Sequence, residues 1–418
     1  MDEHIGRGVK PGLERISALL DLLANPQDGY PIVHVAGTNG KTSSVRMAAN
    51  LISSHGLTPG TFTSPHLHRV EQRYEYGLQE MTPGQFALAI AELAPLVDFY
   101  EQQSGDGVTY FEVTAALAHA WFAENAVDAA VIEVGLGGRL DATNATRSDV
   151  AVVTTIGLEH TAYLGDTIAE IAVEKLAILD EGAVLVTGRL HPEARAVAER
   201  KALELESTWF ERGRDFDVSD ARHVDGGWLF DIQSVYEEYV DVELRLLGRH
   251  QVDNFATAVA SIEALFGRPL DKAGVREAAA TVTSPGRMEI LRRDPLVMVD
   301  GAHNPEAADA LARALEEELS GVRWEIVFGT MVDKKAQEML LPLENVITAL
   351  HAVAVDNPRA RSAAETAAIA SDVLDVAVTT HRSIPAALDA AMASSNAVLV
   401  TGSIYLVGEA REILSQES

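Results

Sequence analysis

Short apolar runs alternate with segments of helical periodicity along almost the whole of this 418-residue chain. The clearest runs are PIVHVAG, PGTFTS, DAAVIEVG, DVAVVTTIG and AVLVTG, and helical patterns such as KTSSVRMAANLISSHG and TIAEIAVEKLAILDEG lie between them. Continuous apolar strands that alternate with helices are typical of a parallel sheet covered on both faces. The pattern therefore predicts an α/β protein built on a mostly parallel sheet.

Two interruptions of this pattern divide the chain. From about Trp209 to Leu247, the runs GWLFDIQ and YVDVELRLLG alternate with a period of two, which predicts a small antiparallel layer, and a helix is expected at QVDNFATAVASIEALFG. The stretch TVTSPGRMEILRRDP has the composition of a linker. After it, strand-like runs alternate with helices again, in LVMVDGAHNP, VRWEIVFGTM, HAVAVDNP, VAVTTH and NAVLVTGS. We expect two domains, residues 1–284 and a smaller α/β domain of residues 285–418.

Composition excludes several classes of protein and partner. The chain has no cysteine, which excludes disulfides, thiolate metal sites and cysteine nucleophiles and fits a reducing compartment. No segment has the length of a membrane span or the apolar core of a signal peptide, so we expect a soluble cytoplasmic protein. The formal net charge of -29 repels nucleic acid and anionic membranes. An anionic substrate would then need a local basic pocket, for which turn-associated candidates are Lys41, Arg69, Arg73, Arg139 and Arg287.

The segment HVAGTNGKTSSV, residues 34–45, has the features of a phosphate-binding loop. An apolar strand leads into the turn GTNG and a helical pattern follows, which is the context that such a loop requires. Glycines let backbone N–H groups point at an anion, and the helix N-terminus adds positive charge. Lys41 would reach the β- and γ-phosphates, and the Thr42 hydroxyl would bind Mg²⁺. The short form G-x-x-G-K-T departs from the common motif because Val35 replaces its first glycine. We expect nucleotide contacts from Gly37, Thr38, Asn39, Gly40, Lys41, Thr42 and Ser43.

A second glycine-rich turn, VGLGGRLDATN, raises the alternative of a dinucleotide site. It reads G-x-G-G instead of G-x-G-x-x-G, and no helix clearly follows it. The acidic residue expected at the end of a second strand is also missing. NAD and FAD are therefore not the expected cofactors.

Three polar residues stand at the carboxyl ends of predicted parallel strands. Ser64 follows PGTFT, Glu133 ends DAAVIE and His160 follows VVTTIGLE. Ligands of open α/β sheets bind outside these ends, and Mg²⁺ prefers oxygen ligands. Each residue alone has a plainer interpretation as a cap, an ion-pair partner or a turn residue. Together they predict a metal site on the same edge as Lys41, with Glu133 as its acid.

The chain resembles the bacterial folylpolyglutamate synthase/dihydrofolate synthase family. Its members are ATP-dependent amide ligases related to the Mur ligases. The stretches that carry the resemblance extend over nearly the whole chain: PGLERI, HVAGTNGKTS, TSPHLHRVEQR, TYFEVTAALA, VIEVGLGGRLDATN, IGLEHTAYLGDTIAEIAVEKLAI, GRHQVDNFATAV, SPGRMEI, VDGAHNP and TGSIYLVG. The phosphate-binding loop is shared with all Mur-type ligases, whereas GLGGRLDATN and DGAHNP in this order are more specific to the folate branch.

The resemblance implies a fold and a set of site residues. It implies an N-terminal ATPase domain with a phosphate-binding loop and a C-terminal Rossmann-like domain, with the active site between them. It implies Mg²⁺ at two sites, with Ser64, Glu133 and His160 as ligands, and a carbamate on Lys175 that helps to hold a metal. It places Asn254 and Arg287 on ATP, and Asp300 and His303 facing the nucleotide and the reacting centre. A pteroate pocket is implied at Leu13, Arg69, Thr109, Phe111, Asp141 and Ala142.

The reaction implied by the resemblance is addition of L-glutamate to dihydropteroate, to the γ-carboxylate of folates, or to both. The acceptor carboxylate attacks the γ-phosphate of ATP to give an acyl phosphate and ADP, and the amino group of glutamate then displaces phosphate. Lys41, Lys175, Asp300 and His303 are the expected catalytic residues, and a monomer is expected.

Three alternatives remain open from the sequence. A Mur-type ligase for a UDP-muramyl peptide is favoured by Thr42, where folate enzymes often have a smaller residue, but only about thirty residues precede the phosphate-binding strand, too few for the UDP-binding domain of such a ligase. An NTPase switch would not need a second α/β domain that carries DGAHNP. A dinucleotide oxidoreductase would bind NADH, which fluorescence titration detects.

Overall fold

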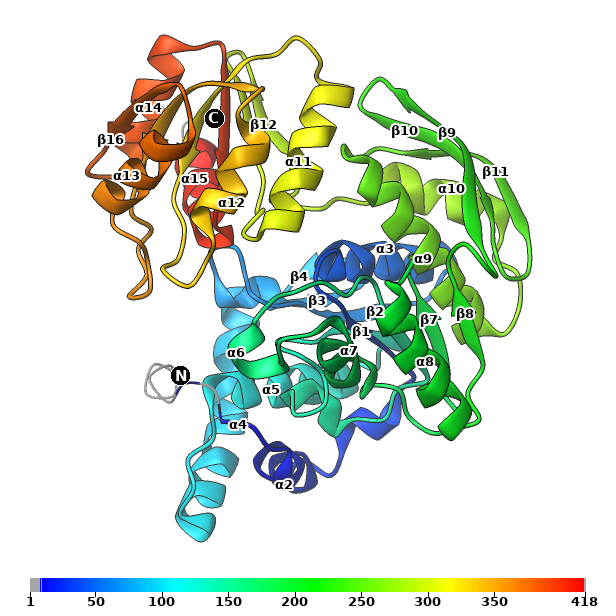
Figure 1. Cartoon of the computed structure of the whole chain (residues 1–418). Helices are drawn as coiled ribbons and strands as arrows, with labels where there is room; N and C mark the ends of the chain where they lie inside the picture. The colour runs from blue at the N-terminus through cyan, green and yellow to red at the C-terminus, as the bar shows by residue number, and fades with distance from the viewer. Residues whose placement is uncertain (1–7, 9, 417–418) are drawn as a thin grey trace.

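An eight-stranded sheet forms the centre of the N-terminal part of the molecule in the computed structural model, which describes residues 8 and 10–416 (Figure 1). The strand order is β4-β3-β2-β5-β1-β6-β7-β8, and every pair from β2 to β8 is parallel. A short antiparallel hairpin, β3–β4, extends one edge. The strands are β1 (Ile32–Ala36), β2 (Pro59–Phe62), β3 (Tyr74–Tyr76), β4 (Gln79–Glu80), β5 (Ala129–Glu133), β6 (Val150–Val153), β7 (Val184–Thr187) and β8 (Trp209–Glu211).

Helices cover both faces of this sheet because its central strands are apolar on both sides. All five residues of β1 and all five of β5 are buried. One face packs on α3 (Lys41–Ser54) and α9 (Arg249–Phe266). The other face packs on α2 (Glu14–Leu22), α4 (Pro83–Ser104), α5 (Tyr110–Glu124), α7 (Ile168–Leu176) and α8 (Pro192–Glu204). One-turn α6 (Thr161–Leu164) precedes α7.

A three-stranded antiparallel sheet packs outside α9. It has the order β11-β10-β9, with β9 (Asp217–Val224), β10 (Gly227–Gln233) and β11 (Glu238–Leu244). Its apolar face and α10 (Lys272–Thr281) share a core with α3 and α9. This layer therefore supports α9 from behind, on the side away from the large sheet.

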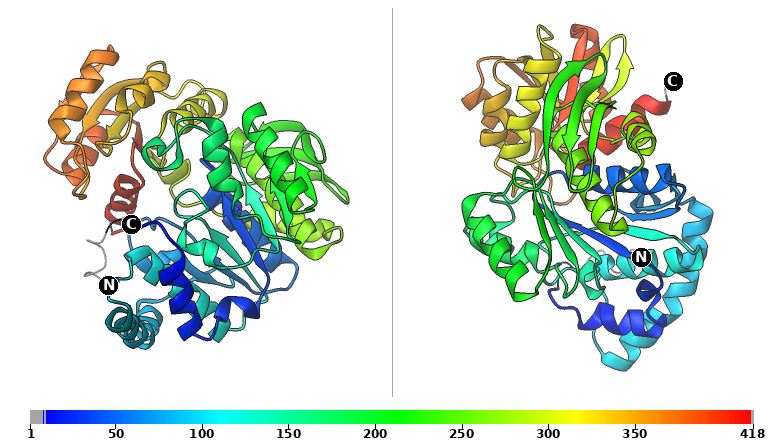
Figure 2. Two further views of the ribbon diagram at one scale, coloured as in Figure 1. Left: turned by 60° about the horizontal axis from the view of Figure 1, so that its bottom comes forward. Right: turned by 90° about the vertical axis from the view of Figure 1, so that its right-hand side faces the viewer.

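The C-terminal part has its own six-stranded sheet in the order β12-β13-β17-β14-β15-β16, parallel except for the β12–β13 pair. Its strands are β12 (Glu289–Arg293), β13 (Leu296–Val299), β14 (Trp324–Phe328), β15 (Ile347–Ala352), β16 (Ala377–Thr380) and β17 (Ala397–Thr401). One face packs on α11 (Pro305–Glu318), α12 (Ala336–Leu340) and α13 (Ala363–Val373), the other on α14 (Ile384–Ser394) and α15 (Ile404–Gln416). Figure 2 shows from two further sides that the two large sheets lie in separate parts of the molecule.

The predicted fold class is confirmed: a mostly parallel sheet, an antiparallel layer and a second α/β part are all present. Three details differ. The Trp209 strand joins the large sheet as β8 instead of the antiparallel layer. The run HAVAVDNP holds only the end of β15, which begins at Ile347, because the partly exposed start of that strand hides its pattern. The hairpin β3–β4 carries too few residues to give a periodic signal. The predicted domain boundary at Pro285 falls between α10 and β12 and stays a prediction.

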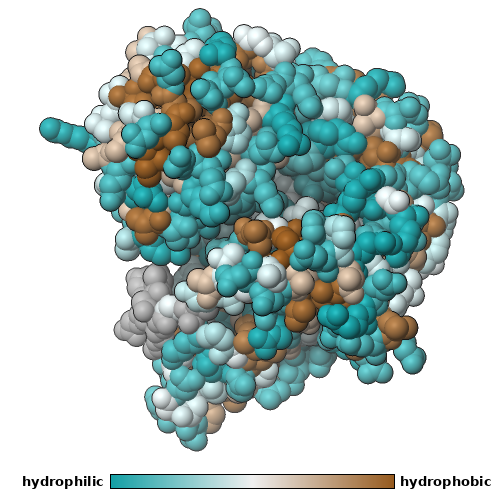
Figure 3. Space-filling model, viewed as in Figure 1, coloured by the Kyte–Doolittle hydropathy of each residue, from teal (hydrophilic) through white to brown (hydrophobic). Residues whose placement is uncertain are grey.

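None of the helices in the described part of the chain is long and apolar enough to cross a membrane. The face shown in Figure 3 is largely hydrophilic and has a hollow between the two parts of the molecule.

A buried histidine in α5 makes stability depend on pH. His119 is 1% exposed, its Nδ1 lies 3.0 Å from the Tyr30 hydroxyl, and burial lowers its pKa to about 4. An unfolded histidine has a pKa near 6.5, so the unfolded chain takes up a proton first as pH falls. The stability that neutral His119 contributes is therefore complete above about pH 6.5 and is lost toward about pH 4.

We expect the His119→Gln variant to lose about 2 kcal/mol less of its unfolding free energy than the wild type between about pH 7.5 and pH 5. Denaturant unfolding of both proteins at the two pH values measures this difference. Equal losses would show that His119 titrates normally in the folded protein.

Candidate active site

The loop between β1 and α3 is held between the residues that follow β6 and the side chain of Asn254 on α9. Its backbone is fixed to the end of β6: Thr38 N donates to Thr155 O at 2.8 Å, and Asn39 N donates to Thr155 Oγ1 at 3.0 Å. Gly40 has φ +84°, and a Cβ there would meet Asn254 Oδ1 at 2.6 Å. A side chain at that position would thus be strained and would collide, so glycine is required. The predicted strand–loop–helix arrangement is present.

Lys41 extends over this loop from the first turn of α3. Its Nζ donates to Gly37 O at 2.8 Å and to Thr38 O at 3.3 Å. The ammonium group therefore lies among the loop residues, where it would meet a bound phosphate. On the same helix, Ser43 Oγ lies 3.0 Å from Ser284 Oγ, so the start of α3 contacts the linker that leads to the C-terminal part.

Glu133 and two neighbours form the oxygen-rich part of the site. Thr42 Oγ1 lies 3.0 Å from each carboxylate oxygen of Glu133, and Ser64 N donates to Oε2 at 3.2 Å. The carboxylate is almost fully buried, which raises the pKa of Glu133, and the charge of Lys41 opposes this rise. The carboxyl ends of β5 and β2 thus bring the two predicted ligands Glu133 and Ser64 together, with Thr42 beside them.

A magnesium ion would suit this donor set. The described residues include no cluster of three or more His, Cys, Asp and Glu side chains that could hold a metal. The predicted ligands here are one carboxylate and two hydroxyls, and Mg²⁺ takes few protein oxygens and keeps several waters. His160 lines the same cavity, with a left-handed backbone (φ 48°) and a pKa lowered by burial. His160 thus lies in the same cavity as Thr42, Ser64 and Glu133, but it forms no hydrogen bond with Glu133.

Lys175 is buried beneath the loop instead of lying on a solvated helix face. It is 2% exposed, and its Nζ donates to Glu159 Oε1 at 2.8 Å and to Gly37 O at 2.9 Å. Burial lowers the pKa of Lys175 to about 8, although the adjacent Glu159 carboxylate acts in the opposite direction. An appreciable fraction of the amine is therefore neutral near neutral pH, which is the form that reacts with carbon dioxide.

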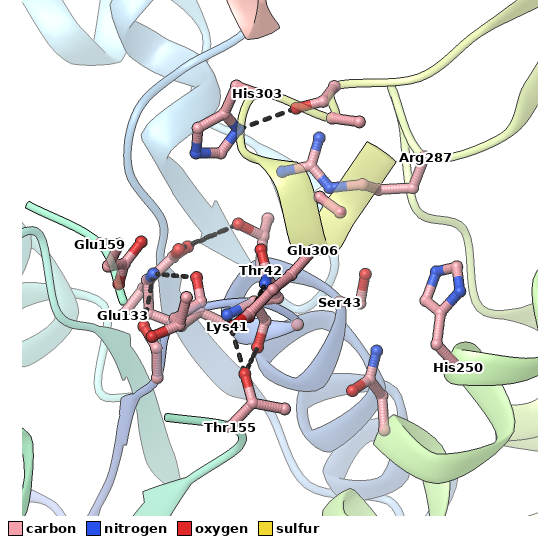
Figure 4. Close-up of a pocket in the computed structure, with 18 of the residues that line it drawn as sticks. Lys41, Thr42, Ser43, Glu133, Thr155, Glu159, His250, Arg287, His303 and Glu306 are labelled. Carbon is pink, nitrogen blue, oxygen red and sulfur yellow. Dashed lines mark hydrogen bonds between the residues drawn. The ribbon is translucent and has the colours of Figure 1, made fainter. Parts of the chain in front are cut away.

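Arg287 and His303 of the C-terminal part lie above the phosphate-binding loop (Figure 4), and Asp300 lines the same cavity. Asp300 accepts hydrogen bonds from Met288 N (2.9 Å) and Ala302 N (2.8 Å), and burial raises its pKa. Nδ1 of His303 lies 2.9 Å from the carbonyl of Gly301 and must donate to it, which leaves Nε2 as an acceptor.

Burial lowers the pKa of His303 to about 4, so this ring is neutral at neutral pH.

Hydrogen bonds also join the N-terminal and C-terminal parts directly. Asn304 Nδ2 donates to Asn39 Oδ1 at 3.0 Å, and Asn39 Nδ2 donates to Glu306 Oε2 at 3.3 Å. The start of α11 therefore lies against the phosphate-binding loop.

Two cavities meet between the parts. The first has a volume of about 390 Å³ and contains every predicted nucleotide and catalytic residue: Gly37, Thr38, Asn39, Gly40, Lys41, Thr42, Ser43, Lys175, Asn254, Arg287, Asp300 and His303. The second, of about 470 Å³, has more apolar walls. Both are lined by Ser64, His160, Arg287 and His303, which therefore mark their junction.

The second cavity holds four of the six residues predicted for the pteroate pocket: Thr109, Phe111, Asp141 and Ala142. The other two lie elsewhere. Leu13 lines a separate shallow depression, and Arg69 extends outward to pair with Glu80 at 3.5 Å, with half of its side chain exposed. The structure therefore does not bring Leu13 and Arg69 to this cavity.

Two of the four residues also have local structural roles. Thr109 caps α5 through the N–H of Glu112. Asp141 accepts hydrogen bonds from Leu136 N (2.8 Å), Thr143 N (3.1 Å) and Thr143 Oγ1 (2.6 Å). These donors occupy much of the acceptor capacity of Asp141. Phe111 lines the cavity together with Tyr163 and Tyr405, and its ring offers an aromatic surface for a planar ligand.

Comparison with known proteins agrees with this geometry. The Mur ligase middle domain matches residues 35–262, and the Mur ligase glutamate ligase domain matches residues 286–404. A dihydrofolate synthase/folylpolyglutamate synthase of Mycobacterium tuberculosis is 36% identical over 98% of this chain and 91% of its own. The chain belongs to the folylpolyglutamate synthase/dihydrofolate synthase family of Mur ligases.

Solved structures of this family have the same fold. A folylpolyglutamate synthase of Mycobacterium tuberculosis complexed with ADP and AMPPCP superposes with a TM-score of 0.94 at 37% identity, covering 97% of this chain and 95% of that one. An Escherichia coli protein in complex with DHPP and ADP superposes with a TM-score of 0.88 at 30% identity, covering all of this chain and 96% of that one. As a member of this family, the chain is an ATP-dependent ligase.

The ligase site also contains polar residues that sequence reasoning missed. Glu159 holds Lys175, His250 lines the nucleotide cavity near Asp300, and Glu306 contacts the phosphate-binding loop. Glu159 directly precedes His160, so its position beside a predicted ligand was a usable signal. His250 lies within GRHQVDNFATAV and Glu306 directly follows VDGAHNP, but neither stretch singles these two residues out. The packing of α9 and α11 brings them to the site.

Proposed function

We propose that the chain joins L-glutamate to the carboxylate of dihydropteroate and to the γ-carboxylate of folates, with ATP as the energy source. The observation that carries this proposal is the junction of the two cavities. A nucleotide above the phosphate-binding loop and a planar carboxylic acid against Phe111 would present their reacting ends to the same residues, Ser64, Arg287 and His303. The names of the relatives and the DHPP and ADP in the Escherichia coli complex support this choice of substrates.

In the first step an oxygen of the acceptor carboxylate attacks the γ-phosphorus of ATP, and ADP leaves. Two anions must approach each other, which costs Coulomb energy. Lys41 from below and Arg287 from above would offset this repulsion. Most of the rate enhancement then comes from positioning and preorganised charge, as in other phosphoryl transfers.

In the second step the amino nitrogen of glutamate attacks the acyl carbon, phosphate leaves, and the nitrogen loses its proton. His303 is neutral and has Nε2 available as an acceptor at the junction. Water has to be excluded because it would hydrolyse the acyl phosphate. The contact of Asn304 and Glu306 with Asn39 closes the nucleotide cavity on that side.

Magnesium would be held by Thr42, Ser64 and Glu133, with His160 beside them, and would supply positive charge next to the phosphate oxygens. The predicted carbamate on Lys175 would have to replace the present contact of Nζ with Glu159. The second metal site, the monomeric state and the cytoplasmic location stay predictions.

Release of phosphate from ATP tests the proposal. We expect release only when L-glutamate and an acceptor, dihydropteroate or tetrahydrofolate, are both present. Release that needs neither would indicate an NTPase switch. Release that needs another carboxylic acid would indicate a Mur-type ligase of different specificity.

Gly135 allows the ring of Phe111 to lie in the second cavity, because a Cβ at Gly135 would overlap the tip of that ring. We expect Gly135→Ala to displace the ring and to raise the KM for dihydropteroate by a factor on the order of 10, with a smaller change in the KM for ATP. Gly29→Ala is the matched control, since a Cβ there meets nothing within 4 Å. Unchanged kinetics of Gly135→Ala would contradict the placement of the acceptor against Phe111.

A further inference from the structure

Arg73 lies in the wall of the second cavity, next to the junction with the first. It ends the short 3₁₀ helix η2 (Val70–Arg73), and its carbonyl accepts a hydrogen bond from Thr63 N at 2.9 Å. This contact places Arg73 beside the strand end that carries Ser64. The whole residue is 7% exposed, yet it lines the cavity.

The guanidinium group of Arg73 is held in place but is not neutralised. Its Nε donates to Nδ1 of His66 at 3.0 Å, and its Cζ lies 5.5 Å from the centre of the Tyr110 ring. Because a guanidinium group has only N–H donors, Nδ1 of His66 is the acceptor of this bond and does not neutralise the charge of Arg73. Nη1 is buried and has no hydrogen-bond partner, and no carboxylate in the described part of the chain forms an ion pair with Arg73.

The lack of a carboxylate partner distinguishes Arg73 from the other buried cations. In the part of the chain that the structure describes, only Arg15, Arg73 and Lys175 are cations buried to this degree. Arg15 donates to Glu112 at 2.9 Å, and Lys175 donates to Glu159 at 2.8 Å. A buried charge normally has such a partner, since burying an unpaired charge is strongly unfavourable. The missing partner of Arg73 indicates an anion that enters the cavity.

We propose that Arg73 binds a carboxylate of the acceptor, dihydropteroate or folate, and so anchors its acidic end at the junction of the two cavities. This inference rests on the proposed function and names a residue that determines how the acceptor is held. The planar guanidinium group of Arg73 suits a carboxylate, to which it can donate two parallel hydrogen bonds.

The position of Arg73 favours the acceptor over the free glutamate. Arg73 belongs to the N-terminal part, on the side of Phe111, whereas Lys334 and Arg359 line the same cavity from the C-terminal part. Lys10 and Arg139 also line the cavity from the N-terminal part, but they pair with Asp106 and Glu174, so Arg73 is the cation on this side that has no carboxylate partner among the described residues. Arg73 also takes the place of Arg69, which lies four residues earlier and points out to Glu80.

The test compares Arg73→Met with the wild type. Methionine keeps an apolar stem beside Tyr110 and removes the charge. We expect the KM for dihydropteroate and tetrahydrofolate to rise about 10- to 100-fold, from the loss of a charge-assisted hydrogen bond, with the KM for ATP and for glutamate changed less than about threefold. Since an unpaired buried charge is removed, the melting temperature should stay equal or rise.

Three results would overturn the proposal: an unchanged acceptor KM, a rise in the KM for glutamate instead, or a lower melting temperature with all KM values raised together. Arg200→Gln is the matched control, because Arg200 is exposed, forms only a 3.9 Å pair with Glu204 and lines neither cavity. Arg73→Lys keeps the charge without the planar guanidinium group and should recover part of the loss.

Equilibrium binding of dihydropteroate to the wild type and to Arg73→Met separates this inference from the proposed function. A wild type that neither binds nor turns over dihydropteroate or tetrahydrofolate would refute the proposed function. A wild type that binds dihydropteroate no better than Arg73→Met would refute the role of Arg73 alone.

Discussion

Replacing Lys41 by methionine is expected to lower kcat by a factor on the order of 10²–10³, because the charge that stabilises the transferred phosphoryl group is lost. In the structure the hydrogen bonds of Nζ go to the carbonyls of Gly37 and Thr38, within the loop itself, so we expect the variant to fold. The measurement is steady-state phosphate release in the presence of dihydropteroate and L-glutamate.

The melting temperature of Lys41→Met should match that of the wild type to within a few degrees. A variant that unfolds early would make the kinetic loss uninformative, and Lys41→Arg, which keeps the charge, then serves as the second variant. Full activity of a folded Lys41→Met protein would show that this loop does not bind the reacting phosphate.

Glu133→Gln is expected to reduce kcat by a similar factor, on the order of 10²–10³, and to raise the magnesium concentration needed for half-maximal activity. The amide preserves the size of the side chain and its contact with Thr42 but removes the negative charge. Titration of activity with magnesium chloride measures both effects.

Stability should change in the opposite direction to activity in this variant. Burial raises the pKa of Glu133, which means that the protein holds this charge at a cost. Glu133→Gln should therefore be as stable as the wild type or more stable, as is common for sites that store strain for function. A destabilised variant with an unchanged magnesium requirement would indicate that Glu133 is a structural residue.

The sequence predicted those parts of the site that depend on local pattern. An apolar strand, a glycine turn and a Lys-Thr pair specify a phosphate-binding loop without further information. Glu133 and Ser64 were predicted to be neighbours because the carboxyl ends of parallel strands meet at one edge of a sheet, and the structure places Ser64 N 3.2 Å from Glu133 Oε2.

Other parts could not be predicted because they depend on packing between distant elements. The spacing of VEKLAI does not show that Lys175 is buried under Gly37, which follows from the way α7 lies against the end of β1. Arg69 and Arg73 are four residues apart and equally basic in the sequence, yet one points to solvent and the other into the cavity. The two residues stand at opposite ends of the short helix η2, Arg69 as its N-cap and Arg73 as its last residue.

The most direct test of the central claim is the mass of the product. The protein is incubated with ATP, magnesium chloride and L-glutamate, and with either dihydropteroate or tetrahydrofolate. We predict that dihydropteroate gains one glutamyl unit, that tetrahydrofolate gains one or more, and that ADP and phosphate form in equal amounts. Product from tetrahydrofolate alone would contradict the placement of dihydropteroate in the second cavity. A failure to extend either acceptor, with ATP still hydrolysed, would contradict the account of this chain as a glutamate ligase for folates.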